Sequence, residues 1–313
     1  MKPVVVLVAR LLEKTQALLE AEFDARRLYE AADREAFLRE VAPVARALAT
    51  FGAAGADAAL MDRLPRLELI AHFGVGVDAI DLDAARARGI AVTNTPGVLD
   101  DCVADTALSL VLNLLRRFPQ AERYLREGRW ARQGAFPLTT ALAGKTMGLL
   151  GLGRIGEAIA RRAEAFRMRI RYHNRRPKAG VPWPYDPDPV ALAQHSDVLV
   201  VATPGGPETA RLVGAAVLDA LGPEGFLVNI ARGSVVDEPV LLRYLQERRI
   251  AGAGLDVFDN EPNVDPAFFA LENAVLYPHV GSASEETRTA MGMLQLENLR
   301  AHFAGRALPS RVV

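Results

Sequence analysis

The sequence predicts an α/β protein with two doubly wound parallel-sheet domains. Short apolar runs alternate with helical stretches as far as Gly97, and a second series of the same kind begins at Gly144. The length of 313 residues also suits about two domains. Because parallel strands are joined by crossovers, usually helices, this alternating order predicts sheets that are covered by helices on both faces.

Apolar runs and helical spacing predict the elements of the first series. Asp33 is a candidate N-cap, and Gly89 ends the last helix of this series. The turn cluster Asn94-Thr95-Pro96-Gly97 is where we expect the chain to pass between domains. The predicted strands are Val4–Val8, Phe23–Tyr29, Leu67–Phe73 and Ile90–Thr93, and the predicted helices are Leu11–Glu22, Asp33–Val44 and Asp81–Arg88.

A long, mostly apolar helix is predicted over Asp100–Gly128, and a loop over Gly134–Leu142. We expect this helix to pack between domains or subunits. The second series then predicts strands at Met147–Leu150, Met168–His173, Asp197–Ala202, Gly225–Ile230, Gly252–Val257 and Val275–Leu276, and helices at Glu157–Arg167, Val190–His195, Glu238–Arg248 and Ser284–Phe303.

Composition narrows the classes of partner. Half of the residues are hydrophobic and the net charge is −1, which argues against nucleic acid or a membrane surface as the main partner. Cys102 is the single cysteine, so we expect no internal disulfide and no metal site. The apolar core of the first ten residues is too short for a signal peptide, and no apolar run approaches ~18 residues. A cytoplasmic protein is expected.

The stretch G-K-T-M-G-L-L-G-L-G-R-I-G at 144–156 contains the pattern G-x-G-x-x-G between a predicted strand and a predicted helix. This context indicates a dinucleotide site, with the helix N-terminus facing the phosphates. Gly151 allows the tight turn, Gly153 the approach of backbone to a pyrophosphate, and Gly156 close packing of helix and strand. The alternative is a merely tight strand-to-helix turn.

The end of the second strand of this series indicates which dinucleotide binds. NAD sites usually place an acid there, but this strand ends in His173-Asn174-Arg175-Arg176. Arginine can bind a 2′-phosphate through paired, charge-assisted hydrogen bonds. The sequence therefore predicts NADP(H) in preference to NAD(H), unless the two arginines only form a solvated loop.

Three polar residues follow strands of the second series. Arg232 follows F-L-V-N-I, Glu261 lies after G-A-G-L, and His279 follows A-V-L. Because carboxyl ends of parallel strands meet at one edge, these side chains are candidates for hydride-transfer chemistry, which needs a proton donor and a substrate anchor. On spacing alone, a structural role for His279 stays open.

The sequence resembles the D-isomer-specific 2-hydroxy acid dehydrogenase family nearly end to end. Within it, the Asn–Arg end of the second strand and G-R-W at 128–130 resemble the glyoxylate/hydroxypyruvate reductase branch. Seven motifs carry the resemblance: F-G-V-G-V-D-A-I-D at 73–81, N-T-P-G-V-L at 94–99, V-A-D-T-A-L at 103–108, G-L-G-R-I-G at 151–156, N-I-A-R-G-S-V-V-D-E at 229–238, A-G-L-D-V-F at 253–258 and P-H-V-G-S-A-S at 278–284.

The resemblance implies roles for individual residues. His279 is the expected acid/base and Glu261 its carboxylate partner, while Arg232 binds the substrate carboxylate together with backbone N–H groups of Val75 and Gly76. The resemblance also implies that Trp130 reaches the active site of the neighbouring subunit, although a plain interface or core role stays open. The residues expected around the cofactor are Thr106, Gly151, Gly153, Arg154, Ile155, Gly156, Asn174, Arg175, Arg176, Thr203, Pro204, Thr209, Ile230, Ala231, Asp256, His279 and Gly281.

Some of these cofactor contacts have alternatives. Asp256 can be a structural acid at a strand end, Pro204 an ordinary turn proline, and Arg154 a solvent-facing side chain. His72 departs from the family pattern in front of the F-G-V-G loop, where it is expected to narrow or polarise the substrate mouth.

The family also implies a domain arrangement. A Rossmann-like dinucleotide-binding domain of residues 98–284 is inserted into a flavodoxin-like substrate domain of residues 1–97 and 285–313. The active site is expected in the cleft between them. The resemblance further implies a homodimer with its interface in Asp100–Trp130.

The resulting hypothesis is NADPH-dependent reduction of small 2-oxo acids, glyoxylate and hydroxypyruvate first, to D-2-hydroxy acids. The same chemistry on bulkier aryl-pyruvates is the second interpretation. A non-catalytic, nucleotide-sensing protein on the same fold is the third.

Overall fold

The computed structural model describes residues 2–313, which form two compact units. Unit 1 comprises the chain up to Leu99 together with Ala283–Val313, and unit 2 is Asp100–Ser282. The expected domain limits, after Gly97 and before Glu285, lie close to these unit limits. That unit 1 binds the substrate and unit 2 the dinucleotide stays a prediction.

Unit 1 is a five-stranded parallel sheet in the order β2-β1-β3-β4-β5. Because side chains alternate across a strand, Val5 and Leu7 face α1 and α12, whereas Val6 faces α2, α3 and α4. Its elements are β1 (Val4–Leu7), α1 (Glu13–Glu22), β2 (Asp24–Arg27), η1 (Leu28–Glu30), α2 (Arg34–Val41), β3 (Ala45–Phe51), α3 (Ala58–Asp62), β4 (Leu69–Phe73), α4 (Leu82–Ala87), β5 (Ala91–Thr93) and α12 (Glu285–Phe303).

The four predicted strands of unit 1 are confirmed, and so is the N-cap Asp33, whose carboxylate accepts from two backbone N–H groups of α2. The sequence-based prediction missed the central strand β3 and the short helix α3. The β3 sequence A-R-A-L-A-T-F is rich in alanine, which has little intrinsic preference for strands. It is a strand because both of its faces are buried between the two helix layers.

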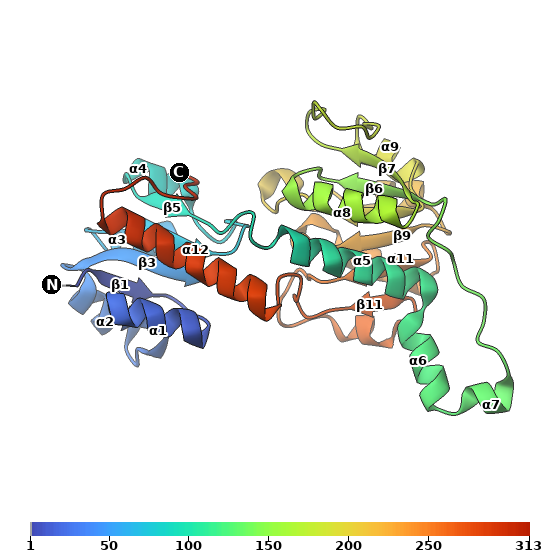
Figure 1. Cartoon of the computed structure of the whole chain (residues 1–313), viewed down its shortest axis with the longest axis horizontal. Helices are drawn as coiled ribbons and strands as arrows, with labels where there is room; N and C mark the ends of the chain where they lie inside the picture. Colours follow the sequence, from blue (N-terminus) through green and yellow to red (C-terminus); the bar gives the residue numbers. More distant parts are fainter. Residues whose placement is uncertain (1) are drawn as a thin grey trace. The chain divides into compact units, whose positions relative to one another are not determined.

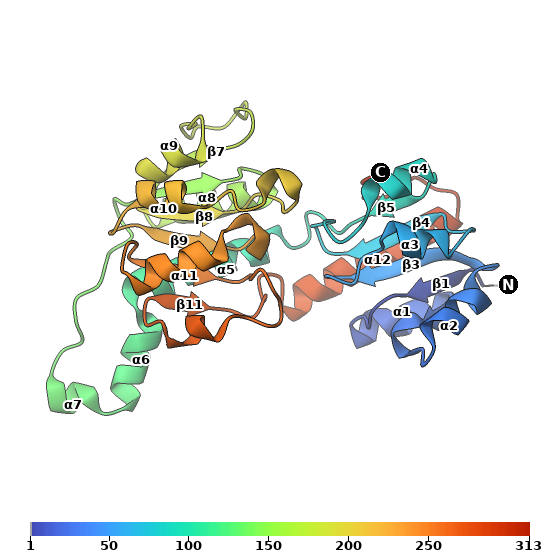
Figure 2. The same cartoon turned by 180° about the vertical axis from the view of Figure 1, so that it is seen from behind.

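Unit 2 contains a six-stranded parallel sheet in the order β11-β10-β9-β8-β6-β7. Helices α5 and α8 pack together on one face, and α9, α10 and α11 cover the other (Figures 1 and 2). The fold class predicted from the sequence is therefore confirmed. Its strands are β6 (Thr146–Leu150), β7 (Arg169–His173), β8 (Val198–Val201), β9 (Phe226–Asn229), β10 (Gly252–Leu255) and β11 (Ala274–Leu276), and its helices of the sheet layers are α5 (Asp100–Arg116), α8 (Arg154–Ala165), α9 (Pro189–Gln194), α10 (Ala215–Leu221) and α11 (Glu238–Gln246).

The single helix predicted over Asp100–Gly128 is wrong. Helix α5 ends at Arg116, Arg117 adopts a left-handed conformation with φ of 52°, and α6 (Phe118–Arg126) then leaves in a new direction. Pro119 explains the break, because its ring lacks an N–H and clashes with a carbonyl of the preceding turn. Figure 1 shows α6 and the short α7 (Arg129–Gln133) extending away from the sheet of unit 2. Helix α10 was also not predicted.

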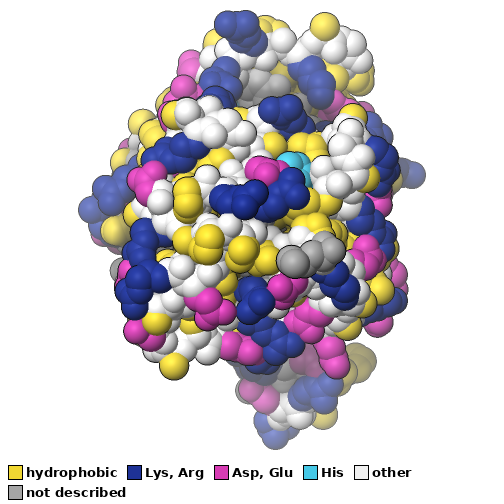
Figure 3. All heavy atoms as spheres, turned by 90° about the vertical axis from the view of Figure 1, so that its left-hand side faces the viewer, with side chains coloured by type: hydrophobic (Ala, Val, Ile, Leu, Met, Phe, Trp, Pro, Cys, Tyr) yellow, Lys and Arg dark blue, Asp and Glu magenta, His cyan; other side chains and the backbone are white. Residues whose placement is uncertain are grey.

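Charged side chains of both signs are interspersed on the face of the molecule in Figure 3, in keeping with the net charge of −1. Within residues 2–313, no helix combines the length and the apolar character that crossing a membrane would require.

Packing between α1 and α12 yields a prediction about stability. Gly292 of α12 lies against Thr15 of α1, and an added Cβ would overlap the threonine side chain. We expect Gly292→Ala to lower the free energy of unfolding by about 1–3 kcal/mol, measured by urea unfolding. In a Thr15→Ala background the same change should be neutral or stabilising, because alanine favours helix. Equal destabilisation in both backgrounds would contradict this packing argument.

Candidate active site

The glycine-rich loop joins β6 to α8 at the carboxyl edge of the unit 2 sheet. Gly151 has φ of +107°, and an added Cβ would lie 2.7 Å from the backbone of Ala202 and Thr203. Nothing lies within 4 Å of an added Cβ at Gly153, the N-cap of α8, and no side chain caps that helix. Uncapped N–H groups beside open space fit the pyrophosphate of a dinucleotide.

Strand β7, the second strand of unit 2 in chain order, is followed by no acidic residue at the place where NAD sites usually have one. Asn174 does not project freely, because its Oδ1 accepts from the backbone N–H of Leu152 at 2.7 Å. The next two side chains, Arg175 and Arg176, are exposed. Arg175 Nη1 lies 2.6 Å from Oε2 of Glu208, which belongs to the loop after β8. Sequence reasoning missed Glu208, since no spacing rule places that loop beside the end of β7.

The remaining cofactor candidates lie in loops after the strands or on α5. Thr209 donates through its hydroxyl to the carbonyl of Pro204 at 2.7 Å, which closes the loop after β8. Thr106 of α5 donates to the carbonyl of Gly281 at 3.3 Å. Arg154 is exposed and ion-paired with Asp100 at 3.2 Å. Thr203 stands in the loop after β8 and Ile230 and Ala231 follow β9. Their contact with a cofactor stays a prediction.

His279 and Glu261 meet directly. Nδ1 of His279 lies 2.6 Å from Oε2 of Glu261, and the other carboxylate oxygen accepts from the backbone N–H of Phe258 at 2.8 Å. An ionised carboxylate only accepts hydrogen bonds, so Nδ1 carries the hydrogen and Nε2 is left for other partners. The His279 side chain is 47% exposed and that of Glu261 32%.

Asp256 fixes the loop that carries His279. Its buried carboxylate accepts from the backbone N–H groups of Val280 at 2.7 Å and Gly281 at 2.8 Å, and its carbonyl accepts from the N–H of His279. His279 has φ of 52°, a left-handed conformation that is uncommon for a non-glycine residue. Burial raises the pKa of Asp256, although the two N–H groups and the nearby imidazole act in the opposite direction. The structural alternative considered for Asp256 thus has direct support from these contacts.

Arg232 follows β9 in a tightly held turn. The side chain of Asn229 donates to the carbonyl of Arg232 at 2.9 Å and accepts from the N–H of Ala231 at 3.0 Å. Gly205 leaves room for the arginine, since an added Cβ would lie 2.8 Å from its Cγ. Gly233 packs directly on the backbone of Phe258, which joins this turn to the loop of Glu261.

The charges of the three residues are coupled. Burial alone would raise the pKa of Glu261, but the hydrogen bonds from His279 and Phe258 and the charges of His279 and Arg232 outweigh it and lower that pKa. Behind this group, Oε2 of Glu238 accepts from the N–H of Asp259 at 2.8 Å, and burial raises the pKa of Glu238. Glu238 was not singled out from the sequence. It is a support of the Glu261 loop that spacing alone does not reveal.

The substrate candidates outside unit 2 lie after β4 of unit 1. Asn94 donates to the carbonyl of Val75 at 2.9 Å, and Gly76 follows in the same loop. The role expected for His72 at the substrate mouth stays a prediction. The His72 side chain is buried in β4, where Nδ1 lies 2.8 Å from the hydroxyl of Thr50.

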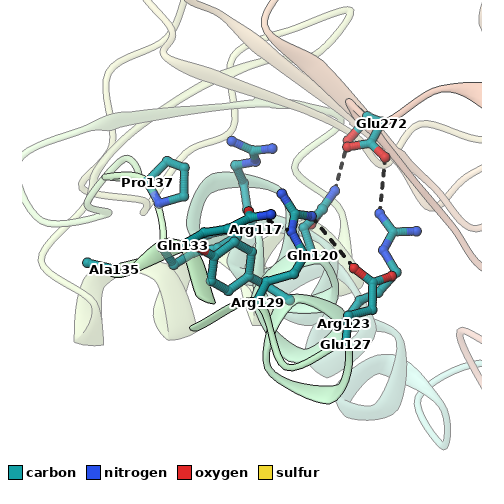
Figure 4. A pocket seen from close by; sticks show the side chains of 11 residues that line it. Arg117, Gln120, Arg123, Glu127, Arg129, Gln133, Ala135, Pro137 and Glu272 are labelled. Atoms are coloured by element: carbon teal, nitrogen blue, oxygen red, sulfur yellow. Dashed lines mark hydrogen bonds and ion pairs between the residues drawn. The ribbon is translucent and has the colours of Figure 1, made fainter. Parts of the chain in front are cut away.

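Trp130 lies on α7 and is 63% exposed. A cavity of about 600 Å³ beside α6 and α7 has a polar lining that includes Arg123 and Glu272, joined by an ion pair of 3.1 Å (Figure 4). None of the three predicted catalytic residues lines this cavity. Within unit 2, the structure therefore brings Arg232, Glu261 and His279 together. Trp130 lies apart from them on α7, in the arm formed by α6 and α7.

A glycine loop before a helix and a histidine–carboxylate pair at the same sheet edge are typical of dinucleotide-dependent oxidoreductases. A family model described as D-isomer specific 2-hydroxyacid dehydrogenase, NAD binding domain, matches residues 108–281. The chain belongs to the D-isomer-specific 2-hydroxyacid dehydrogenase family, as its motifs predicted, and the assignment to an enzyme family is confirmed.

Three relatives illustrate this membership. Glyoxylate/hydroxypyruvate reductase A of Arabidopsis thaliana is 49% identical, covering 94% of this chain and 94% of that protein. Hydroxyphenylpyruvate reductase of Plectranthus scutellarioides is 48% identical, covering 94% of this chain and 95% of that one. The crystal structure of an NADPH-dependent glyoxylate/hydroxypyruvate reductase from Sinorhizobium meliloti with NADP and malonate has a TM-score of 0.95, 47% identity, and coverage of 100% and 97%.

The lowered pKa of Glu261 predicts a pH-dependent effect of Glu261→Gln. A carboxylate with a depressed pKa in the folded state stabilises the fold above its unfolded pKa, and this contribution is lost as the pH falls through the folded pKa. We expect the variant to be less stable than wild type by about 1 kcal/mol near pH 6, since the pair is partly exposed. The difference should shrink towards about pH 3, measured by denaturant unfolding. A constant difference over this range would refute the assignment.

Proposed function

We propose that the protein reduces small 2-oxo acids, glyoxylate and hydroxypyruvate first, to D-2-hydroxy acids with NADPH. The observation that carries this proposal is the His279–Glu261 pair of 2.6 Å, with the charge of Arg232 acting on the same carboxylate. The relatives named as glyoxylate/hydroxypyruvate reductases support the substrate class.

The chemistry assigned to the side chains follows from their donors and charges. NADPH supplies a hydride to the carbonyl carbon of the substrate when it is bound. His279 donates a proton from Nε2 to the carbonyl oxygen, so that the new C–H and O–H bonds give the 2-hydroxy acid. Glu261 stabilises the charged imidazole before that transfer and holds its tautomer through Nδ1.

Arg232 binds the substrate carboxylate, for which its planar, permanently charged guanidinium is suited. The backbone N–H groups of Val75 and Gly76 are proposed as further donors to the same carboxylate. The preference for NADPH over NADH rests on Arg175 and Arg176 and on the NADP named with the Sinorhizobium meliloti relative.

Aryl-pyruvates are the second candidate substrates. The relative named as a hydroxyphenylpyruvate reductase is 48% identical, almost as similar as the relative named for glyoxylate and hydroxypyruvate. The stretch Ala131–Leu142, which includes the end of α7 and the loop after it, matches the reductase branch loosely. We propose this stretch as the segment that senses the substrate side chain.

A spectrophotometric assay of the full chain tests this function. Glyoxylate, hydroxypyruvate and hydroxyphenylpyruvate are each offered with NADPH and with NADH in parallel. We expect the highest kcat/KM for the small acids with NADPH. Preferential turnover of hydroxyphenylpyruvate would favour the second candidate, and no turnover with any acid would favour a nucleotide-sensing protein.

We also propose that the protein acts as a homodimer with its interface in Asp100–Trp130. The helices α6 and α7 and the loop after them expose several large apolar side chains that a partner could cover: Phe118, Leu125, Trp130 and Leu138. Contact of Trp130 with the active site of the neighbouring subunit is a separate proposal, which rests on the family resemblance.

Replacement of His279 tests the proton donor. Asn retains a side-chain hydrogen bond to Glu261 but cannot donate the catalytic proton, so His279→Asn should lower kcat by about 10²- to 10⁴-fold. Its affinity for NADP⁺, measured by calorimetry, should stay unchanged.

His302→Asn is a matched control for this prediction. Nε2 of His302 lies 2.9 Å from Glu68, so the control also removes one partner of a histidine–glutamate pair, in unit 1. This variant should retain the kcat of wild type. If His279→Asn did so as well, His279 would not be the proton donor.

A further inference from the structure

The ion pair between Arg175 and Glu208 joins two loops at the proposed nucleotide site. Arg175 follows β7, and Glu208 lies in η2 (Pro207–Thr209) between β8 and α10. Nη1 of Arg175 and Oε2 of Glu208 are 2.6 Å apart. A carboxylate therefore lies next to the guanidinium that the sequence assigns to a 2′-phosphate.

Hydrogen bonds of neighbouring residues hold both loops in place. Oδ1 of Asn174 accepts from the backbone N–H of Leu152 in the glycine loop, and the backbone carbonyl of Asn174 accepts from the hydroxyl of Tyr185 at 3.2 Å. On the other side, the N–H and the hydroxyl of Thr209 both donate to the carbonyl of Gly206. Because neighbouring residues are anchored, the backbones of the two loops keep Glu208 close to the start of the Arg175 side chain.

The ion pair itself is readily replaced. The side chains of Arg175 and Glu208 are 87% and 75% exposed, and exposed pairs of this kind contribute about 0.2–1 kcal/mol. A phosphate monoester carries about −1.5 to −2 charge and three acceptor oxygens, so it is the stronger partner for arginine. On binding such a group, Arg175 would turn from Glu208 and leave that carboxylate beside a second negative charge.

We propose that Glu208 is a specificity-determining residue that competes with the 2′-phosphate of NADP(H) for Arg175 and so moderates the preference over NAD(H). This inference rests on the proposed cofactor role of Arg175. NAD(H) lacks the phosphate, so it neither breaks the ion pair nor meets the repulsion. In this proposal Glu208, in the loop after β8, is the acid near the ribose of the nucleotide, where NAD sites usually place an acid at the end of the second strand.

The test compares NADP⁺ and NAD⁺ affinities of the full chain by isothermal titration calorimetry at low ionic strength. We expect Glu208→Gln to tighten NADP⁺ by about two- to fivefold, the effect of losing a surface ion pair, and to leave NAD⁺ unchanged. Raising the salt concentration should reduce this gain, because exposed charges are screened. In an Arg175→Ala background, Glu208→Gln should have a much smaller effect on NADP⁺.

Glu247→Gln is the matched control, because it removes the same charge from an exposed glutamate beside an arginine, Arg249 at 3.9 Å. Glu247 follows the carboxyl end of α11, which leads back to the amino edge of β10, away from the nucleotide loops. It should leave both affinities unchanged.

The inference is overturned if Arg175→Ala weakens NADP⁺ while Glu208→Gln does not tighten it, or if Glu208→Gln tightens both nucleotides equally. In those cases the proposed cofactor preference survives. An Arg175→Ala variant with unchanged NADP⁺ affinity would instead remove the phosphate role of Arg175, and the competition with it.

Discussion

The buried carboxylate of Asp256 is the interaction on which the candidate active site depends. It accepts hydrogen bonds from two backbone N–H groups of the loop after β11, and the backbone carbonyl of Asp256 accepts a third from the N–H of His279. These bonds hold His279 in a left-handed conformation that the residue would otherwise seldom adopt. The imidazole is thereby presented to Glu261 at 2.6 Å. Burying a carboxylate is costly, and the N–H donors offset that cost.

The shared location of the catalytic candidates could be predicted from the sequence by a topological rule, whereas their roles are implied by the family resemblance and stay predictions. Arg232, Glu261 and His279 each follow a strand, and carboxyl ends of parallel strands share an edge. Glu208 and Glu238 could not be found in this way. Each makes a contact with a loop that is distant in sequence: Glu208 with Arg175, and Glu238, at the start of α11, with the N–H of Asp259. Only the folded chain reveals such pairings.

The fold shows the same division. Strongly apolar strands such as β8 and well-capped helices such as α2 were predicted from local pattern alone. Strand β3 was not, because its alanines have little strand preference and its identity comes from burial on both faces. The break between α5 and α6 was also missed, although Pro119 was visible in the sequence. Apolar residues keep their helical spacing on both sides of Arg117, so the sequence pattern did not reveal the change of direction.

Burial separates two carboxylate–cation pairs that occupy the same edge of the unit 2 sheet. Glu261 is partly buried, receives a second hydrogen bond from Phe258, and is fixed against His279, as the proposed general acid–base role requires. Glu208 and Arg175 lie in solvent, where water and salt weaken their attraction. A partly buried pair with a further hydrogen bond is more firmly held, whereas an exposed pair can more readily exchange its partner for a ligand. The same kind of contact therefore suits the proton transfer proposed at one site and the nucleotide discrimination proposed at the other.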